Sequence, residues 1–188
     1  MNVKPVVFVT LLVIGILLLR PTVGFSDQTD ARLDEIFITL KTSDDADLLG
    51  EAEATIWEIW FDSGQEDIDT MMEAARHTVL AGELAMAEAI YTQVIEKMPE
   101  YSEGWNRRAT VRYYRKDYEG SLQDIHRTLI LEPRHFGAIW GLGMILGWQR
   151  DFSGAISAFE RLLEIKPNAP DARTRIELLK RELEKSAV

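Results

Sequence analysis

The 188-residue chain contains no cysteine, which excludes disulfides, thiol nucleophiles and metal sites built from thiolates. It also has no phosphate-binding glycine loop, no nucleophile elbow and no metalloprotease helix. The three histidines, at 77, 126 and 135, have no carboxylate pair nearby at metal-ligand spacing. These absences argue against an enzyme, and we expect no cofactor and no metal.

Positive charge is scarce in the first part of the chain. The net charge is -10, and residues 27–73 hold 15 acids but only two bases, whereas residues 74–188 are nearly balanced. Nucleic-acid binding requires neutralisation of phosphates, so this composition predicts no nucleic-acid partner, and anionic membrane surfaces are disfavoured for the same reason. The acidic segment is interpreted as a solvated face, with a docking surface for a basic partner as the alternative.

No apolar run is long enough to cross a membrane comfortably. The longest, residues 6–19, has 14 residues, or about 21 Å as a helix, against about 30 Å for a bilayer core. Lys4 precedes it, and Gly24 and Ser26 follow it, an order typical of a secretory signal peptide. We expect residues 1–26 to direct export to the periplasm. Because Arg20 directly follows the run, an uncleaved inner-membrane anchor is the alternative, and the only expected membrane attachment.

An internal repeat of 34 residues runs through the second half of the chain. Prolines recur at that interval at positions 99, 133 and 167. Several independent columns in one register predict a repeat architecture. The same interval links Ala75, Ala109 and Gly143, then Ala87, Ser121 and Ala155, and then Tyr91, Ile125 and Phe159.

These columns resemble the tetratricopeptide repeat (TPR), and the third copy is the most similar. It carries Leu142-Gly143, then Ala155, Phe159 and Pro167 at the TPR spacing. The resemblance implies an all-α fold in which helix pairs stack as a right-handed superhelix. It also implies a scaffold that binds proteins or peptides rather than a catalyst.

The repeat register predicts the organisation of the chain. Residues 27–67 are expected to form a divergent, acidic helical pair similar to a leading repeat, and residues 170–188 a capping helix. The capping helix would bury a stripe of Ala172, Ile176, Leu179 and Leu183. Three repeats are expected at 68–101, 102–135 and 136–169, with helices near 70–81, 84–97, 103–115, 118–131, 137–149 and 152–165.

A ligand groove is implied by the family resemblance on the concave face, which the first helix of each repeat lines. Trp140, Met144 and Trp148 recur every four residues on such a helix and therefore share one side. For Trp140 and Trp148 the alternative is burial beneath the capping helix. The predicted groove, suited to an extended peptide or an amphipathic helix, consists of Arg76, Asn106, Tyr113, Trp140, Met144 and Trp148.

One binding mode of TPR co-chaperones is not expected. Some of them clamp a peptide's C-terminal carboxylate with polar and basic side chains, but the matching places here include Met72, Gly137 and Gly141. A basic cluster in residues 107–116 is interpreted as compensation for the acidic leading segment, with a site for an acidic partner as the alternative. His135, in the turn at 132–137, is interpreted as a surface or helix-capping residue.

The sequence also resembles small, signal-bearing TPR proteins of alphaproteobacteria, through Trp57, Trp60, Ser63-Gly64 and the turn at 132–137. This likeness favours an exported adaptor that binds a protein or peptide in the bacterial cell envelope. Two alternatives stay open. One is a structural module that self-associates into a homo-oligomer, and the other is a membrane-tethered assembly factor for cytochrome maturation or outer-membrane biogenesis.

Overall fold

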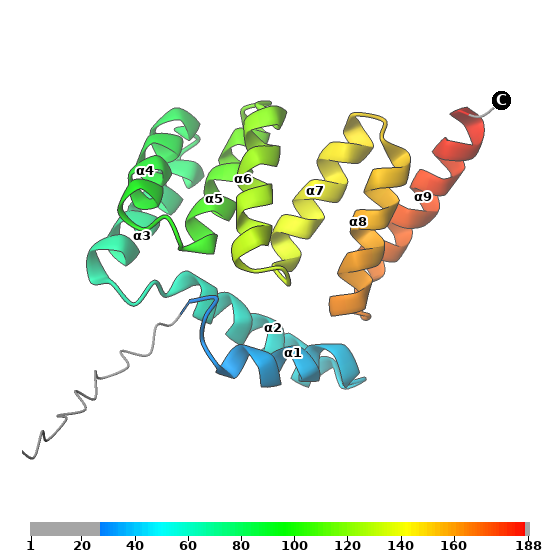
Figure 1. Ribbon diagram of the computed structural model, residues 1–188, viewed down its shortest axis with the longest axis horizontal. Helices are drawn as coiled ribbons and strands as arrows, with labels where there is room; N and C mark the ends of the chain where they lie inside the picture. Colours follow the sequence, from blue (N-terminus) through cyan, green and yellow to red (C-terminus); the bar gives the residue numbers. More distant parts are fainter. Residues whose placement is uncertain (1–26, 187–188) are drawn as a thin grey trace, which may run out of the picture.

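A computed structural model describes residues 27–186, and within this range the chain forms nine helices and no strand (Figure 1). The expected signal peptide lies outside the described residues. In the described part, no helix has the length and apolar character needed to cross a membrane. The helices are α1 (Arg32–Thr42), α2 (Ala46–Phe61), α3 (Glu66–Leu80), α4 (Leu84–Lys97), α5 (Ser102–Tyr114), α6 (Tyr118–Leu131), α7 (Phe136–Trp148), α8 (Phe152–Ile165) and α9 (Pro170–Ser186).

Helices α3 to α8 form three antiparallel pairs that stand side by side, and α9 packs on α8 at the end of the row (Figure 1). This arrangement confirms the predicted all-α repeat solenoid with its capping helix. On α9, Ala172 and Ile176 are buried and Leu179 packs against the core, but Leu183 is 39% exposed. The buried stripe therefore ends before the last turns of the helix.

Local chemistry within each repeat sets the ends of its two helices. The side chains of Asp117 and Asp151 accept hydrogen bonds from backbone N–H groups at the starts of α6 and α8, so each acts as an N-cap. One residue before each aspartate, Lys116 and Arg150 have φ values of 64° and 65°. The first repeat has Gly82 at the same turn position, with φ of 78°. This left-handed conformation ends the preceding helix and costs glycine least.

The small-residue column brings the two helices of a repeat close together, most tightly in the third repeat. A Cβ atom on Gly143 would lie 2.7 Å from Cζ of Phe159, which projects from α8. Ala109 and Ala75, its equivalents, face Ile125 and Tyr91 in the same columns and are buried. In the third repeat the Phe159 ring approaches α7 so closely that no Cβ fits at position 143, and this copy therefore has glycine there.

We expect Gly143→Ala to lower the free energy of unfolding by about 1–3 kcal/mol, because the added methyl would force α7 and α8 apart. Gly50→Ala is the matched control, since Gly50 lies inside α2 and a Cβ there would have no neighbour within 4 Å. That control should raise stability by roughly 0.5–1 kcal/mol through helix propensity. Urea unfolding measures both, and a stabilised Gly143→Ala variant would refute the close contact.

Helices α1 and α2, here called the leading pair, do not extend the stack as a leading repeat would. They lie across the ends of α5 to α8 and contact α5 and α8 rather than continuing the row beyond α3 (Figure 1). The chain leaves α2 in an extended conformation at Asp62 and turns at Gly64, which has φ of 71°. This departure from helical geometry separates α2 from α3, and it allows the leading pair to lie across the row of repeats instead of in line with it.

The apolar face of the leading pair shares one core with the third repeat and α9. Trp60 is fully buried, and its ring packs against Phe136 with a centroid distance of 5.0 Å. The Asp45 side chain accepts hydrogen bonds from the backbone N–H groups of Asp47 and Leu48 and so caps the start of α2. Buried residues of this shared core include Leu33, Phe37, Leu40, Ile56, Ile59, Trp60, Phe136, Ile139, Phe159, Leu162, Ala172 and Ile176.

Candidate binding groove

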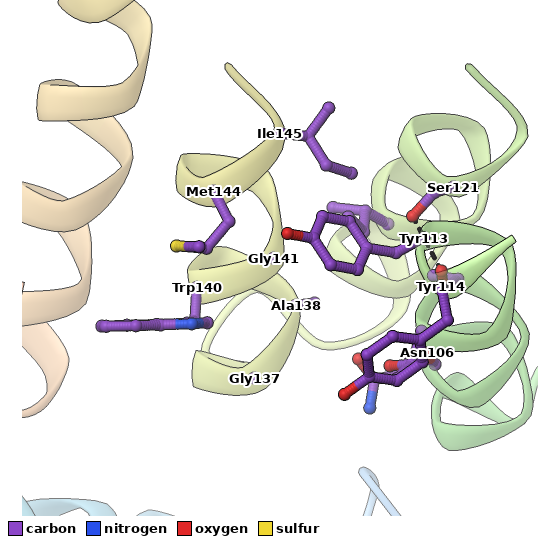
Figure 2. A pocket seen from close by; sticks show the side chains of 13 residues that line it. Asn106, Tyr113, Tyr114, Ser121, Gly137, Ala138, Trp140, Gly141, Met144 and Ile145 are labelled. Carbon is purple, nitrogen blue, oxygen red and sulfur yellow. Dashed lines mark hydrogen bonds between the residues drawn. The ribbon is translucent and has the colours of Figure 1, made fainter. Parts of the chain in front are cut away.

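The first helices of the second and third repeats, α5 and α7, enclose an open cavity of about 300 Å³ (Figure 2). Small residues form part of its lining, because Ala109, Ala138 and Gly141 leave space between the helices. Tyr113 projects from α5 toward this space. None of the residues that line the cavity carries a formal charge: Asn106, Ala109, Thr110, Tyr113, Tyr114, Ser121, Ile125, Gly137, Ala138, Trp140, Gly141, Met144 and Ile145. We call this cavity the α5–α7 groove.

Four of the six predicted groove residues line the α5–α7 groove. Asn106, Tyr113, Trp140 and Met144 come together there from the two helices. Arg76 lies outside the cavity, where its exposed guanidinium pairs with Glu73 on its own helix.

The two tryptophans of α7 differ in environment. Trp148 is 65% exposed and does not line the groove, and its ring packs on Tyr118 at a centroid distance of 4.3 Å. The capping helix therefore does not cover it. Trp140 packs edge-on against Phe159 at 5.1 Å and also lines the groove, so it belongs to both the core boundary and the cavity.

Several lining residues were not singled out by the sequence pattern. Ala138, Gly141 and Ile145 come from α7, whereas Ile125 comes from the second helix of the preceding repeat. Gly141 stands out in the sequence as a glycine within a predicted helix, and in the structure a Cβ there would lie 3.3 Å from Cδ1 of Ile125. For the others no sequence signal distinguishes a lining position from a packing position.

A buried polar network joins the α5–α7 groove to the leading pair. Glu103 at the start of α5 is fully buried and accepts hydrogen bonds from Arg107 and from Nδ2 of Asn106, the latter at 2.9 Å. Nε2 of His135 lies 2.9 Å from the same carboxylate. Because Nδ1 of His135 accepts from the backbone N–H of Ala138, the proton sits on Nε2, which donates to Glu103.

His135 therefore caps α7, as one interpretation of the sequence held, but the surface placement was wrong. Its side chain is fully buried, and the Trp60 ring stacks on it with a centroid distance of 4.1 Å and an interplanar angle of 10°. Tyr101 adds a second link, since its buried hydroxyl lies 2.9 Å from the carbonyl oxygen of Trp60 and 3.0 Å from that of Phe61, at the end of α2. The leading pair is thus held by polar as well as apolar contacts.

The charge on Glu103 makes the stability of this junction pH dependent. Burial opposes the charged carboxylate, but Arg107, His135 and Asn106 together outweigh it and hold the pKa of Glu103 below its ordinary value. The unfolded chain then binds the proton at higher pH than the folded chain. The charged Glu103 carboxylate therefore stabilises the folded protein above about pH 4.5, and this contribution is lost as the pH falls through the folded-state pKa.

We expect Glu103→Gln to be less stable than the wild type near neutral pH, because glutamine lacks the charge that Arg107 requires. The difference between the two proteins should shrink between neutral pH and about pH 3, because below about pH 4.5 the unfolded wild-type chain takes up a proton more readily than the folded carboxylate does. Urea unfolding of both proteins across this range measures the difference directly. A difference that stays constant with pH would show that Glu103 does not titrate as described.

The basic cluster on α5 is neutralised within the repeats, not by the acidic leading segment. Arg108 makes a bidentate pair with the buried Asp124 of α6, at 2.9 and 2.8 Å. Arg112 contacts both Asp124 and Glu88. Arg107 does face the leading pair, but over the ring of Phe61 at 4.2 Å. The expected compensation by the leading segment was wrong because acids of α4 and α6 lie nearer.

Between residues 27 and 186, no cluster of histidine, aspartate and glutamate side chains is arranged to hold a metal ion. What the described residues offer is a neutral groove with aromatic and methionine side chains on a rigid helical frame. Such a surface recognises shape and apolar side chains.

Stacked helical pairs with an open groove between their first helices define a helical-repeat binding scaffold. No family model matches the chain. It is, however, 33% identical over 158 residues to a TPR repeat-containing protein of Rhizobium etli, an alignment that covers 84% of this chain and 78% of that protein. The chain therefore belongs to the family of TPR repeat-containing proteins.

Solved TPR structures share the fold. The Sgt2 TPR domain from Aspergillus fumigatus has a TM-score of 0.61 and 21% identity, covering 65% of this chain and 83% of that one. The first TPR of Spaghetti (RPAP3), bound to the HSP90 peptide SRMEEVD, has a TM-score of 0.60 and 19% identity, covering 62% and 93%. The type III secretion chaperone SycD of Yersinia enterocolitica, in complex with a peptide of the translocator YopD, scores 0.59 at 11% identity, covering 63% and 95%.

Proposed function

We propose that this protein is an exported adaptor that binds an extended segment of a partner protein in the α5–α7 groove. The observation that carries the proposal is the open, uncharged cavity of about 300 Å³ lined by Tyr113, Trp140 and Met144. Apolar pockets with a few polar groups are the usual form of a binding site. The TPR fold is that of a protein-interaction scaffold, and the RPAP3 and SycD structures each hold a peptide.

The groove is tested with random peptides of about twelve residues displayed on phage and selected on the purified protein. Thr110→Arg places a long, charged side chain at the open side of the cavity and should weaken the selected peptides at least about tenfold, because this side chain obstructs the groove. Met86→Arg is the control, since Met86 is 56% exposed on α4 and does not line the groove. Equal binding by the two variants would place the peptide site elsewhere.

Export is supported by the order of basic, apolar and small residues in positions 1–26. Mass spectrometry of the mature N-terminus in the native host, together with cell fractionation, tests it. A chain that begins near residue 27 in the periplasmic fraction supports cleavage and release. A chain that begins at Met1 and sediments with the inner membrane favours the tethered assembly factor instead.

Self-association is a second candidate because one repeat position exposes a large apolar side chain in every repeat. Leu80, Tyr114 and Trp148 are spaced by 34 residues at the ends of α3, α5 and α7, and they are 70%, 60% and 65% exposed. Exposed apolar side chains in a row are a common feature of interfaces. Light scattering over a range of concentrations decides, and a strict monomer would count against this candidate.

A further inference from the structure

A second cavity, of about 280 Å³, lies next to the α5–α7 groove. The two cavities share Gly137 and Trp140 in their linings, so they are contiguous on α7. The second cavity is enclosed by Trp57 of α2, by Phe136 and by Leu162 of α8. One of its walls therefore comes from the leading pair, which is not a repeat.

Several contacts hold this wall in place. Lys166, which follows α8, forms an ion pair with Glu53 on α2, and Nδ2 of Asn168 donates to the carbonyl oxygen of Ser43 at 3.1 Å. The ring of Trp57 meets Phe136 edge-on at a centroid distance of 5.1 Å. A Cβ on Gly137 would lie 2.8 Å from Cη2 of Trp57, so glycine at this position allows the indole to rest against α7.

We propose that the leading pair completes the ligand site, and that a bound segment extends from the α5–α7 groove past Trp140 into the second cavity. The ligand is an extended, uncharged peptide segment with two large apolar side chains, one for each cavity. This inference rests on the proposed function and adds to it the chemistry of the ligand and the role of α2.

The charges around the two cavities select this ligand. The α5–α7 groove has no charged lining residue to pair with a buried ligand charge, and such a charge would be costly. In the second cavity the Lys166 ammonium already lies 5.7 Å from the centre of the Phe136 ring and pairs with Glu53. An anionic side chain would meet Glu53 and Asp171, whereas a cationic one would have to compete with Lys166 for Glu53 and would find only the exposed, solvated carboxylate of Asp171.

An apolar side chain meets no such conflict. Trp57, Phe136 and Trp140 present aromatic surface in the second cavity, and aromatic pairs favour edge-on or offset contact. A phenylalanine side chain can make these contacts without displacing the ion pair at the rim. Both cavities open along α7, so two apolar side chains of one peptide segment can occupy them at the same time. Once the first side chain is bound, the second binds at a high effective concentration.

Isothermal titration calorimetry with designed peptides tests the proposal. The probes are Gly-Ser peptides of about ten residues, acetylated and amidated, with either one phenylalanine or two at several spacings. For the purified wild-type protein we expect the best two-phenylalanine peptide to bind at least about tenfold more tightly than the one-phenylalanine peptide. Asp171→Trp, which places a large side chain at the exposed rim of the second cavity, should reduce the affinity of the best two-phenylalanine peptide to that of the one-phenylalanine peptide.

Two further variants sharpen the outcome. Glu177→Trp adds the same side chain on the exposed face of α9, away from both cavities, and should keep the full advantage. Trp57→Ala should also lose the advantage of the second phenylalanine, as Asp171→Trp does. If Trp57→Ala fails to fold, Asp171→Trp by itself tests the inference. An advantage that survives Asp171→Trp overturns this inference while the proposed function stands. Absence of wild-type binding to every one of these peptides also overturns this inference, and the phage selection then decides whether the proposed function stands.

Discussion

Trp60→Ala is expected to lower the free energy of unfolding by about 3–5 kcal/mol. Trp60 is fully buried between the leading pair and the third repeat, where it stacks on His135 and packs against Phe37 and Phe136. Among the described residues its indole N–H has no hydrogen-bond partner, so the loss is one of packing. Alanine would leave a cavity that neither helix layer can fill.

Urea unfolding of the purified protein measures this loss, and limited proteolysis shows where it acts. We expect cleavage in the leading pair to become faster than cleavage within the repeats, because Trp60 links the two parts. Trp148→Ala is the matched control, since that side chain is 65% exposed. It should cost about 1 kcal/mol or less, in the range of one surface aromatic pair. Similar losses in the two variants would contradict the central place of Trp60.

Asp124→Ala is expected to cost a similar amount, about 3–5 kcal/mol, because it leaves buried arginine charge without its partner. The Asp124 carboxylate is 1% exposed and accepts two hydrogen bonds from Arg108 and one from Arg112. Arg108 itself is only 9% exposed and has little access to water. Thr92 is the remaining partner of its guanidinium, through a hydrogen bond of 3.1 Å.

The double variant Arg108→Met with Asp124→Leu separates the cost of an orphaned charge from the value of the pair. Because it removes both partners and keeps apolar volume, it should be clearly more stable than Asp124→Ala. Glu100→Ala breaks an exposed pair with Arg127 and should change stability by less than about 1 kcal/mol. Urea unfolding of the three variants ranks them. A double variant as unstable as Asp124→Ala would show that packing, not charge, dominates here.

The repeat region was predictable because its determinants are local and recur. Each helix pair needs a small residue, a bulky partner and a turn, and all three lie within one period of 34 residues. The aspartate caps of α6 and α8 act over three residues, and helix ends were therefore expected close to where they occur. The groove residues on α5 and α7 follow from the same register, since equivalent positions face the same side.

Two features resisted prediction because their partners are distant or unusual. Arg108 stands where the TPR pattern has an apolar residue, and its buried partner Asp124 lies 16 residues later on the next helix. His135 looked like a surface residue in a polar turn. Its burial depends on Trp60, which lies in a segment with no repeat pattern to place it.

The repeat columns of the sequence are enough to predict that three helix pairs stack and that a helix caps them, because each unit cannot bury its apolar face alone. The position of the leading pair depends on contacts that form only in the folded protein. Its anchoring contacts join residues far apart in the chain: Asp34 to Arg134 across 100 positions, and Glu53 to Lys166 across 113. No local periodicity encodes such pairs, since they form only when two separately specified surfaces meet. The second cavity lies between these two surfaces, so the sequence alone did not predict it.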